Sequence, residues 1–353
     1  MAATQIRFLI LALGVIISFH YILTFTNETY GNATSLARLK EQFAGSTPKG
    51  GAMDAVSAAP RKANAAFVIL ARNGDLNGIV TSVKQMEDRF NKKFNYPYVF
   101  LNDEPFNDAF KKRITALTDS DVKFGLIPRS VPYRNMCRFN SGFFYRHELL
   151  KQYKYYWRVE PDIKYFCDLD YDPFLVMQDE GKVYGFTVSL FEYPATIPTL
   201  WQTTKGYSAE FINSNPKLVS PENAMAFLSD DGGETYNRCH FWSNFEIGDL
   251  DLWRGEAYSK FFDFLDERGG FYYERWGDAP VHSIGAALFA RKDQIHFFED
   301  IGYRHEPFQH CPQGTPMLKG SAGVILRKTL ASYREWYSCL NKYEALFTNK
   351  TRT

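Results

Sequence analysis

The sequence lacks an excess of either charge, and it lacks the short motifs of several well-known enzyme classes. Its 353 residues carry 41 Lys and Arg against 40 Asp and Glu, which gives a formal net charge of +1. A nucleic-acid-binding protein needs a basic surface, so this balance argues against that class. The motifs G-x-S-x-G, G-x-x-x-x-G-K-[ST] and G-x-G-x-x-G are absent. A serine-hydrolase triad, a P-loop nucleotidase and a dinucleotide-binding enzyme are therefore left without a supporting motif.

Cysteine is also scarce, and none of it forms a C-x-x-C pair. This excludes a zinc ribbon and a thioredoxin-like redox motif. In an oxidising compartment some of the cysteines could form disulfide bonds, but their odd number leaves at least one without an intramolecular partner. The connectivity stays open among the five residues Cys137, Cys167, Cys239, Cys311 and Cys339.

Aromatic residues, by contrast, are abundant, with 6 Trp, 22 Tyr and 31 Phe. A large core is the ordinary explanation, although rings that line a cleft also stack on the apolar faces of sugars. A hydrophobic fraction of 45% with 23% charged residues is typical of a globular protein. The length predicts one or two domains.

The N-terminal region predicts a membrane anchor. Residues 6–25 form an apolar run long enough to span a bilayer as a helix. Basic charge lies at its start, and no Lys or Arg follows until Arg38, so we expect residues 1–5 to be a cytosolic stub and the rest of the chain to be translocated. A cleaved signal peptide is the alternative, but the run exceeds the usual length of its apolar region.

Residues 26–63 are rich in small and polar residues and are expected to form a lumenal stem. Asn-x-Ser/Thr acceptor sites for N-glycosylation fit this orientation. They begin at Asn27, Asn32 and Asn349, all outside the region expected to fold.

From residue 64 onward the pattern predicts one catalytic α/β domain that extends to residue 353. Short apolar runs alternate with helical periodicity, which is typical of a wound sheet. The expected strands are 65–70, 98–101, 122–127, 155–159, 183–188 and 242–247. The expected helices are 75–90, 106–117, 140–153, 255–268 and 281–291.

Polar side chains follow several of these strands, and ligands bind at the carboxyl ends of the strands in such sheets. The resulting candidates are Arg72, Glu160, Asp162, Glu192, Glu246, Asp278 and His305. Carboxylates with an imidazole suit a divalent cation that holds a diphosphate, with Mg²⁺ or Mn²⁺ favoured by oxygen ligands. Arg72 could share the charge of the phosphates. A second acidic motif, Asp168-Leu169-Asp170, resembles a D-x-D metal site but can equally be a solvated turn.

Several long stretches of the sequence resemble the fungal Golgi α-1,2-mannosyltransferases of glycosyltransferase family 15. The resemblance covers residues 60–345 together with the anchor and the stem. The stretches that carry it are residues 133–139 (YRNMCRF), 156–162 (YWRVEPD), 191–201 (FEYPATIPTLW), 240–247 (HFWSNFEI), 273–283 (YERWGDAPVHS) and 302–305 (GYRH).

This resemblance implies a glycosyltransferase A-type fold, a mixed sheet flanked by helices, behind a single-pass type II Golgi anchor with the catalytic domain in the lumen. It implies retaining transfer of mannose from GDP-mannose to a mannoside of O- or N-linked glycans, with Mn²⁺ as cofactor. Residue by residue, it implies that His305 coordinates the metal, that Glu160 and Asp162 lie near the metal and the nucleotide, that Tyr133, Glu192 and Asp278 line the donor and acceptor cleft, and that Glu246 lies near the anomeric carbon. We therefore expect Arg72 and Tyr133 to bind the nucleotide together with Glu160 and Asp162.

Two other functions remain open from the sequence. A metal-independent, α-mannosidase-like hydrolase could use Glu246 with Glu192 or Asp278 as acid and base. A catalytically inactive relative could bind mannan without transferring sugar. The retention mechanism is open as well, because Glu246 could form a covalent glycosyl intermediate or stabilise a cation while the acceptor attacks from the face that GDP leaves.

Overall fold

The computed structural model describes residues 61–128, 132–312 and 336–348. The expected stub at 1–5, the expected anchor at 6–25, the three glycosylation sites and nearly all of the expected stem at 26–63 lie outside these residues. Within the described ranges, none of the helices is long and apolar enough to cross a bilayer.

A seven-stranded mixed sheet organises the described residues, in the order β10-β6-β9-β4-β1-β2-β3. Strands β4, β1, β2 and β3 are adjacent in that order and run parallel, and β9 runs antiparallel between β4 and β6. The strands of this sheet are β1 (Ala65–Leu70), β2 (Tyr98–Asn102), β3 (Val122–Leu126), β4 (Tyr155–Arg158), β6 (Tyr184–Phe186), β9 (Ile247–Asp249) and β10 (Ile295–Phe297). The predicted α/β fold with a mixed sheet is confirmed.

Two small antiparallel sheets are added to this core. One joins β5 (Lys164–Tyr165), β11 (Tyr303–His305) and β12 (Phe308–His310), and the other joins β7 (Ser189–Phe191) and β8 (Cys239–Phe241).

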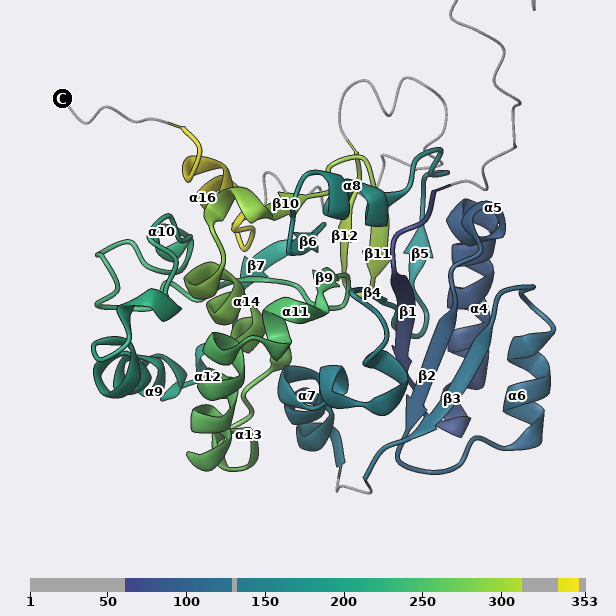
Figure 1. Cartoon of the computed structure of the whole chain (residues 1–353), viewed down its shortest axis with the longest axis horizontal. Coiled ribbons are helices and arrows are strands. Elements are labelled where there is room, and N and C mark those ends of the chain that lie inside the picture. Colours follow the sequence, from purple (N-terminus) through teal and green to yellow (C-terminus); the bar gives the residue numbers. More distant parts are fainter. Residues whose placement is uncertain (1–60, 129–131, 313–335, 349–353) are drawn as a thin grey trace, which may run out of the picture. The chain divides into compact units, whose positions relative to one another are not determined.

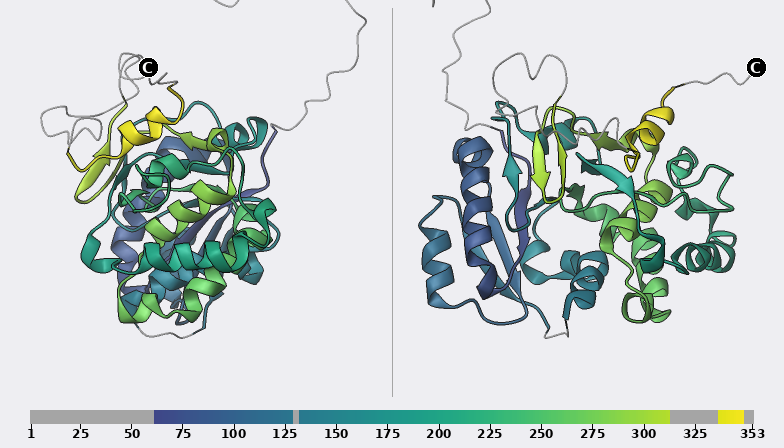
Figure 2. Two further views of the ribbon diagram at one scale, coloured as in Figure 1. Left: turned by 90° about the vertical axis from the view of Figure 1, so that its left-hand side faces the viewer. Right: turned by 180° about the vertical axis from the view of Figure 1, so that it is seen from behind.

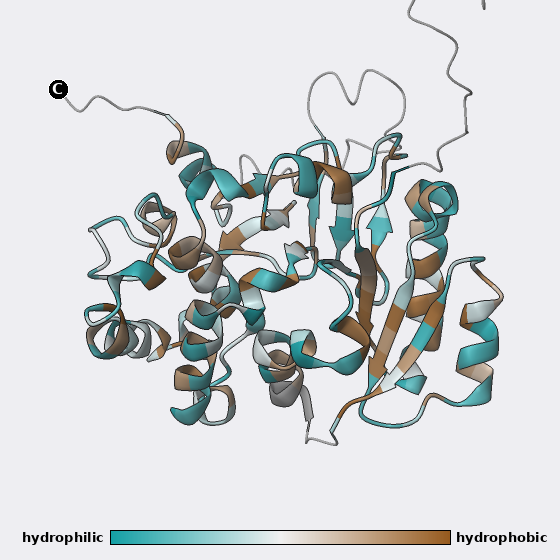
Figure 3. Cartoon of the chain, in the orientation of Figure 1, coloured by the Kyte–Doolittle hydropathy of each residue, from teal (hydrophilic) through white to brown (hydrophobic). Residues whose placement is uncertain are grey.

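Helices cover both faces of the main sheet (Figures 1 and 2). Successive side chains of a strand point to opposite faces, so Phe67 and Ile69 of β1 pack with α4 and α6, whereas Ala66 and Val68 pack with the helices of the other face. Figure 3 shows the hydrophobic colouring concentrated on the central strands. The helices are α4 (Leu76–Met86), α5 (Lys92–Phe94), α6 (Asp108–Thr115), α7 (Pro132–Gly142), α8 (Pro173–Asp179), α9 (Leu200–Tyr207), α10 (Met225–Leu228), α11 (Leu250–Arg254), α12 (Glu256–Glu267), α13 (Gly270–Tyr273), α14 (Asp278–Phe289) and α16 (Leu340–Ala345).

The helix predicted at 140–153 is wrong. Helix α7 ends at Gly142, and two short 3-10 turns follow at Phe144–Arg146 and Glu148–Leu150. The chain becomes extended at His147, where Nδ1 accepts a hydrogen bond from the Leu149 N–H (3.2 Å) and starts a new turn. A local side-chain bond of this kind competes with continuation of a helix.

The strand predicted at 242–247 is also wrong. Strand β8 ends at Phe241 and β9 begins at Ile247, with a turn between them. Trp242 and Phe245 are apolar, but the Phe245 N–H donates to the Trp242 carbonyl (3.3 Å), so both belong to the turn. The strand predicted at 183–188 is shorter, because it ends at Phe186 and a separate strand, β7, follows.

One disulfide bond joins Cys239 at the start of β8 to Cys339, which precedes α16. Its partners are 100 residues apart in sequence. The sequence alone does not determine this pairing. The bond attaches the C-terminal helix to the strand that leads into the turn of Glu246.

Candidate active site

The carboxyl ends of β1 and β4 place the predicted nucleotide and metal residues together. Val68 of β1 lies opposite Arg158 of the neighbouring parallel strand, so Arg72 and Glu160 leave the sheet at the same edge. Pairing of β11 with β5 brings His305 to this edge as well. Four of the predicted residues line one cleft of about 730 Å³, namely Arg72, Glu160, Asp162 and His305.

The Glu160-Pro161-Asp162 segment lies directly on helix α4. The Ser82 hydroxyl donates to the Glu160 carbonyl (2.7 Å), and the Asp162 N–H donates to the Gly78 carbonyl (3.2 Å). Asp162 has a positive φ of 58°, which aspartate tolerates better than most residues. A Cβ on Gly78 would lie 2.7 Å from Asp162 Oδ2, so this close approach depends on glycine.

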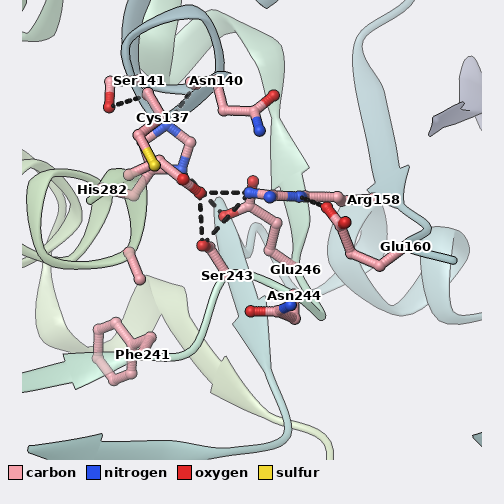
Figure 4. Close-up of polar contacts among 12 residues, drawn as sticks. Cys137, Asn140, Ser141, Arg158, Glu160, Phe241, Ser243, Asn244, Glu246 and His282 are labelled. Carbon is pink, nitrogen blue, oxygen red and sulfur yellow. Dashed lines mark hydrogen bonds and ion pairs between the residues drawn. The ribbon is translucent and has the colours of Figure 1, made fainter. Parts of the chain in front are cut away.

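Arg158, at the end of β4, joins two of the predicted carboxylates. Its Nε donates to Glu160 Oε1 (2.6 Å), and its Nη1 forms an ion pair with Asp278. The Ser243 hydroxyl also donates to Asp278 (2.6 Å). Figure 4 shows Arg158 between Glu160 on one side and Ser243 on the other. One cation therefore holds together groups from the segment after β4, from α14 and from the β8–β9 turn.

Asp278 is held in its ionised form by this network. Burial alone would raise its pKa, but the charges of Arg158 and His282 and the hydrogen bond from Ser243 outweigh burial, so the pKa lies below its ordinary value. Cys137 lies close to the same carboxylate, and burial raises the pKa of its thiol to about 12. That thiol is therefore not an activated nucleophile.

Glu246 ends the β8–β9 turn and is 1% exposed. Its carboxylate accepts hydrogen bonds from the hydroxyls of Tyr156 (2.9 Å) and Tyr184 (3.1 Å), and Nδ1 of His282 lies 3.0 Å from Oε2. It also lines a cavity of about 10 Å³ with Leu70, which lines the larger cleft too. The buried carboxylate is therefore adjacent to the cleft.

The remaining predicted residues are placed less centrally. Glu192 is half-buried. Its Oε2 lies beside Gly277, the residue before α14, at 3.8 Å from the position that a Cβ on this glycine would take. Tyr133 belongs to α7, but its side chain lies outside what the structure describes. Asp168 pairs with Arg89 at a different surface pocket, so the competing D-x-D motif does not contribute to the cleft.

Sequence reasoning missed Arg158, Ser243 and His282, although all three stand inside the stretches that carry the family resemblance. A signal existed for two of them. Arg158 lies between Trp157 and Val159 in a buried strand, and a buried charge requires a partner. His282 interrupts an apolar stretch of helix α14 in the same way.

The described residues include no group of three His, Cys, Asp or Glu side chains that could hold a metal ion alone. His305 nevertheless has the right chemistry for one ligand. Its Nδ1 lies 3.2 Å from the carbonyl oxygen of Glu306, which can only accept, so the neutral form of the ring donates from Nδ1 and has its lone pair on Nε2. Metal-binding histidines commonly use their second nitrogen in this way.

These features define an α/β protein with a cleft of carboxylates and basic groups at the carboxyl ends of parallel strands, the place where such sheets bind ligands. Known proteins with similar sequences support this description. The family described as "Glycolipid 2-alpha-mannosyltransferase" matches residues 26–132 and 129–347. The Saccharomyces cerevisiae protein named glycolipid 2-alpha-mannosyltransferase is 54% identical over 280 residues, which cover 71% of this chain and 62% of the relative. The chain thus spans less than two thirds of that relative.

Solved structures match as well. Core-mannan synthase A from Aspergillus fumigatus, in its Mn/GDP form, has a TM-score of 0.71 at 39% identity and covers 85% of this chain and 91% of its own. The S. cerevisiae mannosyltransferase Ktr4p in complex with GDP has a TM-score of 0.74 at 39% identity, covering 82% and 83%. The chain belongs to the glycolipid 2-alpha-mannosyltransferase family, glycosyltransferase family 15, and the resemblance seen in the sequence is confirmed.

Proposed function

We propose that this chain transfers mannose from GDP-mannose to a mannoside acceptor of O- or N-linked glycans, that it forms an α-1,2 linkage with retention, and that it depends on Mn²⁺. The observation that carries the proposal is one cleft that joins basic, acidic and imidazole groups and is adjacent to the buried carboxylate of Glu246. Two similar proteins of known structure, described with GDP and with Mn and GDP, support it.

In this proposal Arg72 binds the diphosphate, and His305 with Glu160 and Asp162 holds the metal directly or through water. Bound Mn²⁺ would act as a Lewis acid on the charge of the departing GDP. The cleft fits a cation, because the carboxylates of Asp75, Glu160, Asp162 and Glu306 line it together with the single guanidinium of Arg72. Tyr133, Glu192 and Asp278 are proposed to contact donor and acceptor.

Glu246 is proposed as the catalytic carboxylate. It acts either as the nucleophile of a covalent intermediate or as an anion that stabilises positive charge on the sugar while the acceptor attacks. The hydrolase alternative needs a carboxylic acid that carries a proton. Asp278 is unsuited to that role, because its pKa is lowered by Arg158.

We also propose that residues 6–25 anchor the chain as a single-pass type II protein of the Golgi membrane with the catalytic domain in the lumen. The disulfide between Cys239 and Cys339 supports an oxidising compartment. Removal of N-glycans by an endoglycosidase should increase the electrophoretic mobility of the cellular protein, and an unchanged mobility would argue against a lumenal orientation.

The test uses the purified full-length chain with GDP-mannose and methyl α-mannoside. We expect transfer with Mn²⁺, loss of transfer with EDTA, and recovery when Mn²⁺ is restored. The Glu246→Gln variant should lose at least about 10²-fold in kcat, as expected when an electrostatic group of the transition state is removed. Its affinity for GDP should stay within about threefold, because uniform binding is untouched.

Glu87→Gln is the matched control. Glu87 is also a buried glutamate that accepts from a tyrosine hydroxyl, that of Tyr98 (2.7 Å), but it lies away from the cleft. This variant should keep its kcat. Release of free mannose without a metal would favour the hydrolase, and GDP binding without any transfer would favour the inactive relative.

A further inference from the structure

His282 is a buried polar residue for which the proposed reaction has not yet supplied a role. It lies on α14 and is fully buried. Its Nδ1 is 3.0 Å from Glu246 Oε2, and its Nε2 is 3.0 Å from the carbonyl oxygen of Asn140. Figure 4 shows the ring of His282 near Asn140. Both ring nitrogens are thus engaged by groups that come from other elements.

The partners of these nitrogens determine where the hydrogens lie. The carbonyl oxygen of Asn140 can only accept, so Nε2 of His282 must carry a hydrogen. Whether Nδ1 carries a hydrogen depends on the protonation of Glu246. An ionised carboxylate can only accept a hydrogen bond from Nδ1, whereas a protonated one can donate to it.

Two tyrosines favour the ionised carboxylate. The indole Nε1–H of Trp253 donates to the Tyr156 hydroxyl oxygen (2.9 Å), which directs the hydrogen of that hydroxyl to Glu246 Oε1. The hydroxyl of Tyr184 lies 3.1 Å from Oε2. Hydrogen bonds donated to a carboxylate favour its charged form. Nδ1 of His282 then also carries a hydrogen, and the ring is an imidazolium.

The surroundings of the ring favour this positive charge. The indole of Trp253 stacks on the ring of His282 with centroids 4.3 Å apart and planes 18° apart. An aromatic face attracts a cation. Asp278, four residues earlier on the same helix, is an anion, and residues four apart share one face of a helix.

Among the residues that the structure describes, the same contacts leave Glu246 with a single open hydrogen-bonding position. A carboxylate has about four lone-pair positions. Tyr156 occupies one on Oε1, while Tyr184 and His282 occupy those on Oε2. The remaining position is on Oε1, and Glu246 lines the small cavity that adjoins the cleft.

We propose that His282 is a positioning residue that keeps Glu246 ionised and holds it so that one Oε1 position stays open for the reacting sugar. The inference rests on the proposed function, in which Glu246 acts on the transferred mannose. Because His282 acts through Glu246, its loss should affect the chemical step more than the binding of donor.

Two substitutions separate this role from simple packing. His282→Asn places an amide N–H near the position of Nδ1 and keeps a donor to Glu246. His282→Gln extends to the position of Nε2 and keeps only the bond to Asn140. We expect kcat of the Gln variant to fall by about 10²-fold and that of the Asn variant by about tenfold, since one preorganised donor contributes an effect of this size. KM for GDP-mannose should change by less than about threefold in both.

His296→Gln serves as the control, because His296 lies on edge strand β10 with its ring against Phe298 (4.4 Å) and outside the cleft. Its kcat should match that of the unaltered chain. Equal losses of kcat in the Asn and Gln variants of His282, in proportion to their loss of thermal stability, would overturn the proposal.

A spectroscopic measurement separates this inference from the proposed function. In the full-length chain labelled with ¹⁵N-histidine, the signals that disappear in His282→Gln should show two protonated ring nitrogens at neutral pH. A neutral ring would overturn the inference even if mannose is transferred. A protonated ring in a chain that transfers no mannose would contradict the proposed function and leave the ion pair established.

Discussion

At the scale of single residues, Arg158 explains how two carboxylates can be buried side by side. Its guanidinium is 13% exposed and bridges Glu160 and Asp278, which are 15% and 10% exposed. A buried charge without a partner is costly, whereas a hydrogen-bonded pair is tolerated. Arg158 therefore determines where both carboxylates point before any ligand binds.

Asp278 gives this network a pH dependence. Its pKa is below the ordinary value of 3.8 in the folded chain, so the unfolded chain binds the proton more readily. The stability that Asp278 contributes is therefore fully present above that ordinary value and is lost as the pH falls through the lowered pKa.

Asp278→Asn should lower the free energy of unfolding by about 3 kcal/mol at neutral pH, because it removes one partner of a buried ion pair. The difference from the unaltered chain should narrow between about pH 5 and pH 2. Urea denaturation at a series of pH values measures this. Asp168→Asn, at the exposed pair with Arg89, should change stability by less than about 1 kcal/mol. A difference for Asp278→Asn that is constant with pH would contradict the prediction.

Residues of the site could be predicted where the neighbouring sequence indicates their position, and could not where only a contact distant in sequence does. Arg72, Glu160 and Asp162 follow strands that the apolar pattern reveals, and they do lie in one cleft. The sequence predicts Glu246 near the end of a strand at 242–247, but the residue lies in the turn between β8 and β9. The pairing of Arg158 with Asp278 joins positions 120 residues apart, and no local pattern reports such a contact.

At the scale of elements, the predicted strands and helices were most accurate where apolar residues form one continuous run or recur at helical spacing. Strand β1 agrees with its predicted bounds, and the core of α4 was found. The failures at 140–153 and 242–247 are compact turns with many aromatic side chains. Tertiary contacts bury the large apolar residues of these turns, although the turns have no regular secondary structure. The amino-acid composition of these segments therefore resembles that of a helix or a strand.

Helix α4 has a second role besides covering the sheet, because it supports the Glu160-Pro161-Asp162 segment. A Cβ on Gly78 would lie 2.7 Å from Asp162 Oδ2, closer than real Cβ contacts allow, and 3.0 Å from Pro161 Cβ, which is tighter than most real contacts. Any side chain at this position must therefore displace the carboxylate of Asp162 or the segment that carries it.

Gly78→Ala should weaken binding of GDP in the presence of Mn²⁺ by about tenfold, which corresponds to about 1.4 kcal/mol. Stability should change less, because alanine favours a helix over glycine by about 1 kcal/mol. Titration calorimetry measures the affinity. Gly74→Ala is the matched control, since a Cβ there meets nothing within 4 Å. Equal affinities in the two variants would show that Asp162 does not depend on the approach of α4.

At the scale of the whole molecule, the described residues are tied together by contacts between segments far apart in sequence. Strand β9 inserts antiparallel between β4 and β6, an order that alternating strands and helices do not predict. The C-terminal segment packs back onto the sheet, where the Tyr343 hydroxyl donates to the Ile295 carbonyl of β10 (2.7 Å) and the Cys339 N–H donates to the Ser189 carbonyl of β7 (3.1 Å).

The disulfide between Cys239 and Cys339 makes this return covalent. It closes a loop between residues 100 positions apart, and a loop of that size limits the unfolded chain by up to about 4.7 kcal/mol. The double variant Cys239→Ala/Cys339→Ala should therefore lose about 2–5 kcal/mol in its free energy of unfolding. Urea denaturation gives this value, and dithiothreitol should lower the midpoint of the unaltered chain to nearly that of the variant. The variant's own midpoint should not respond to the reductant. Equal destabilisation of both proteins by dithiothreitol would contradict the prediction, because the stabilising bond that the reductant breaks would then not be the one between Cys239 and Cys339.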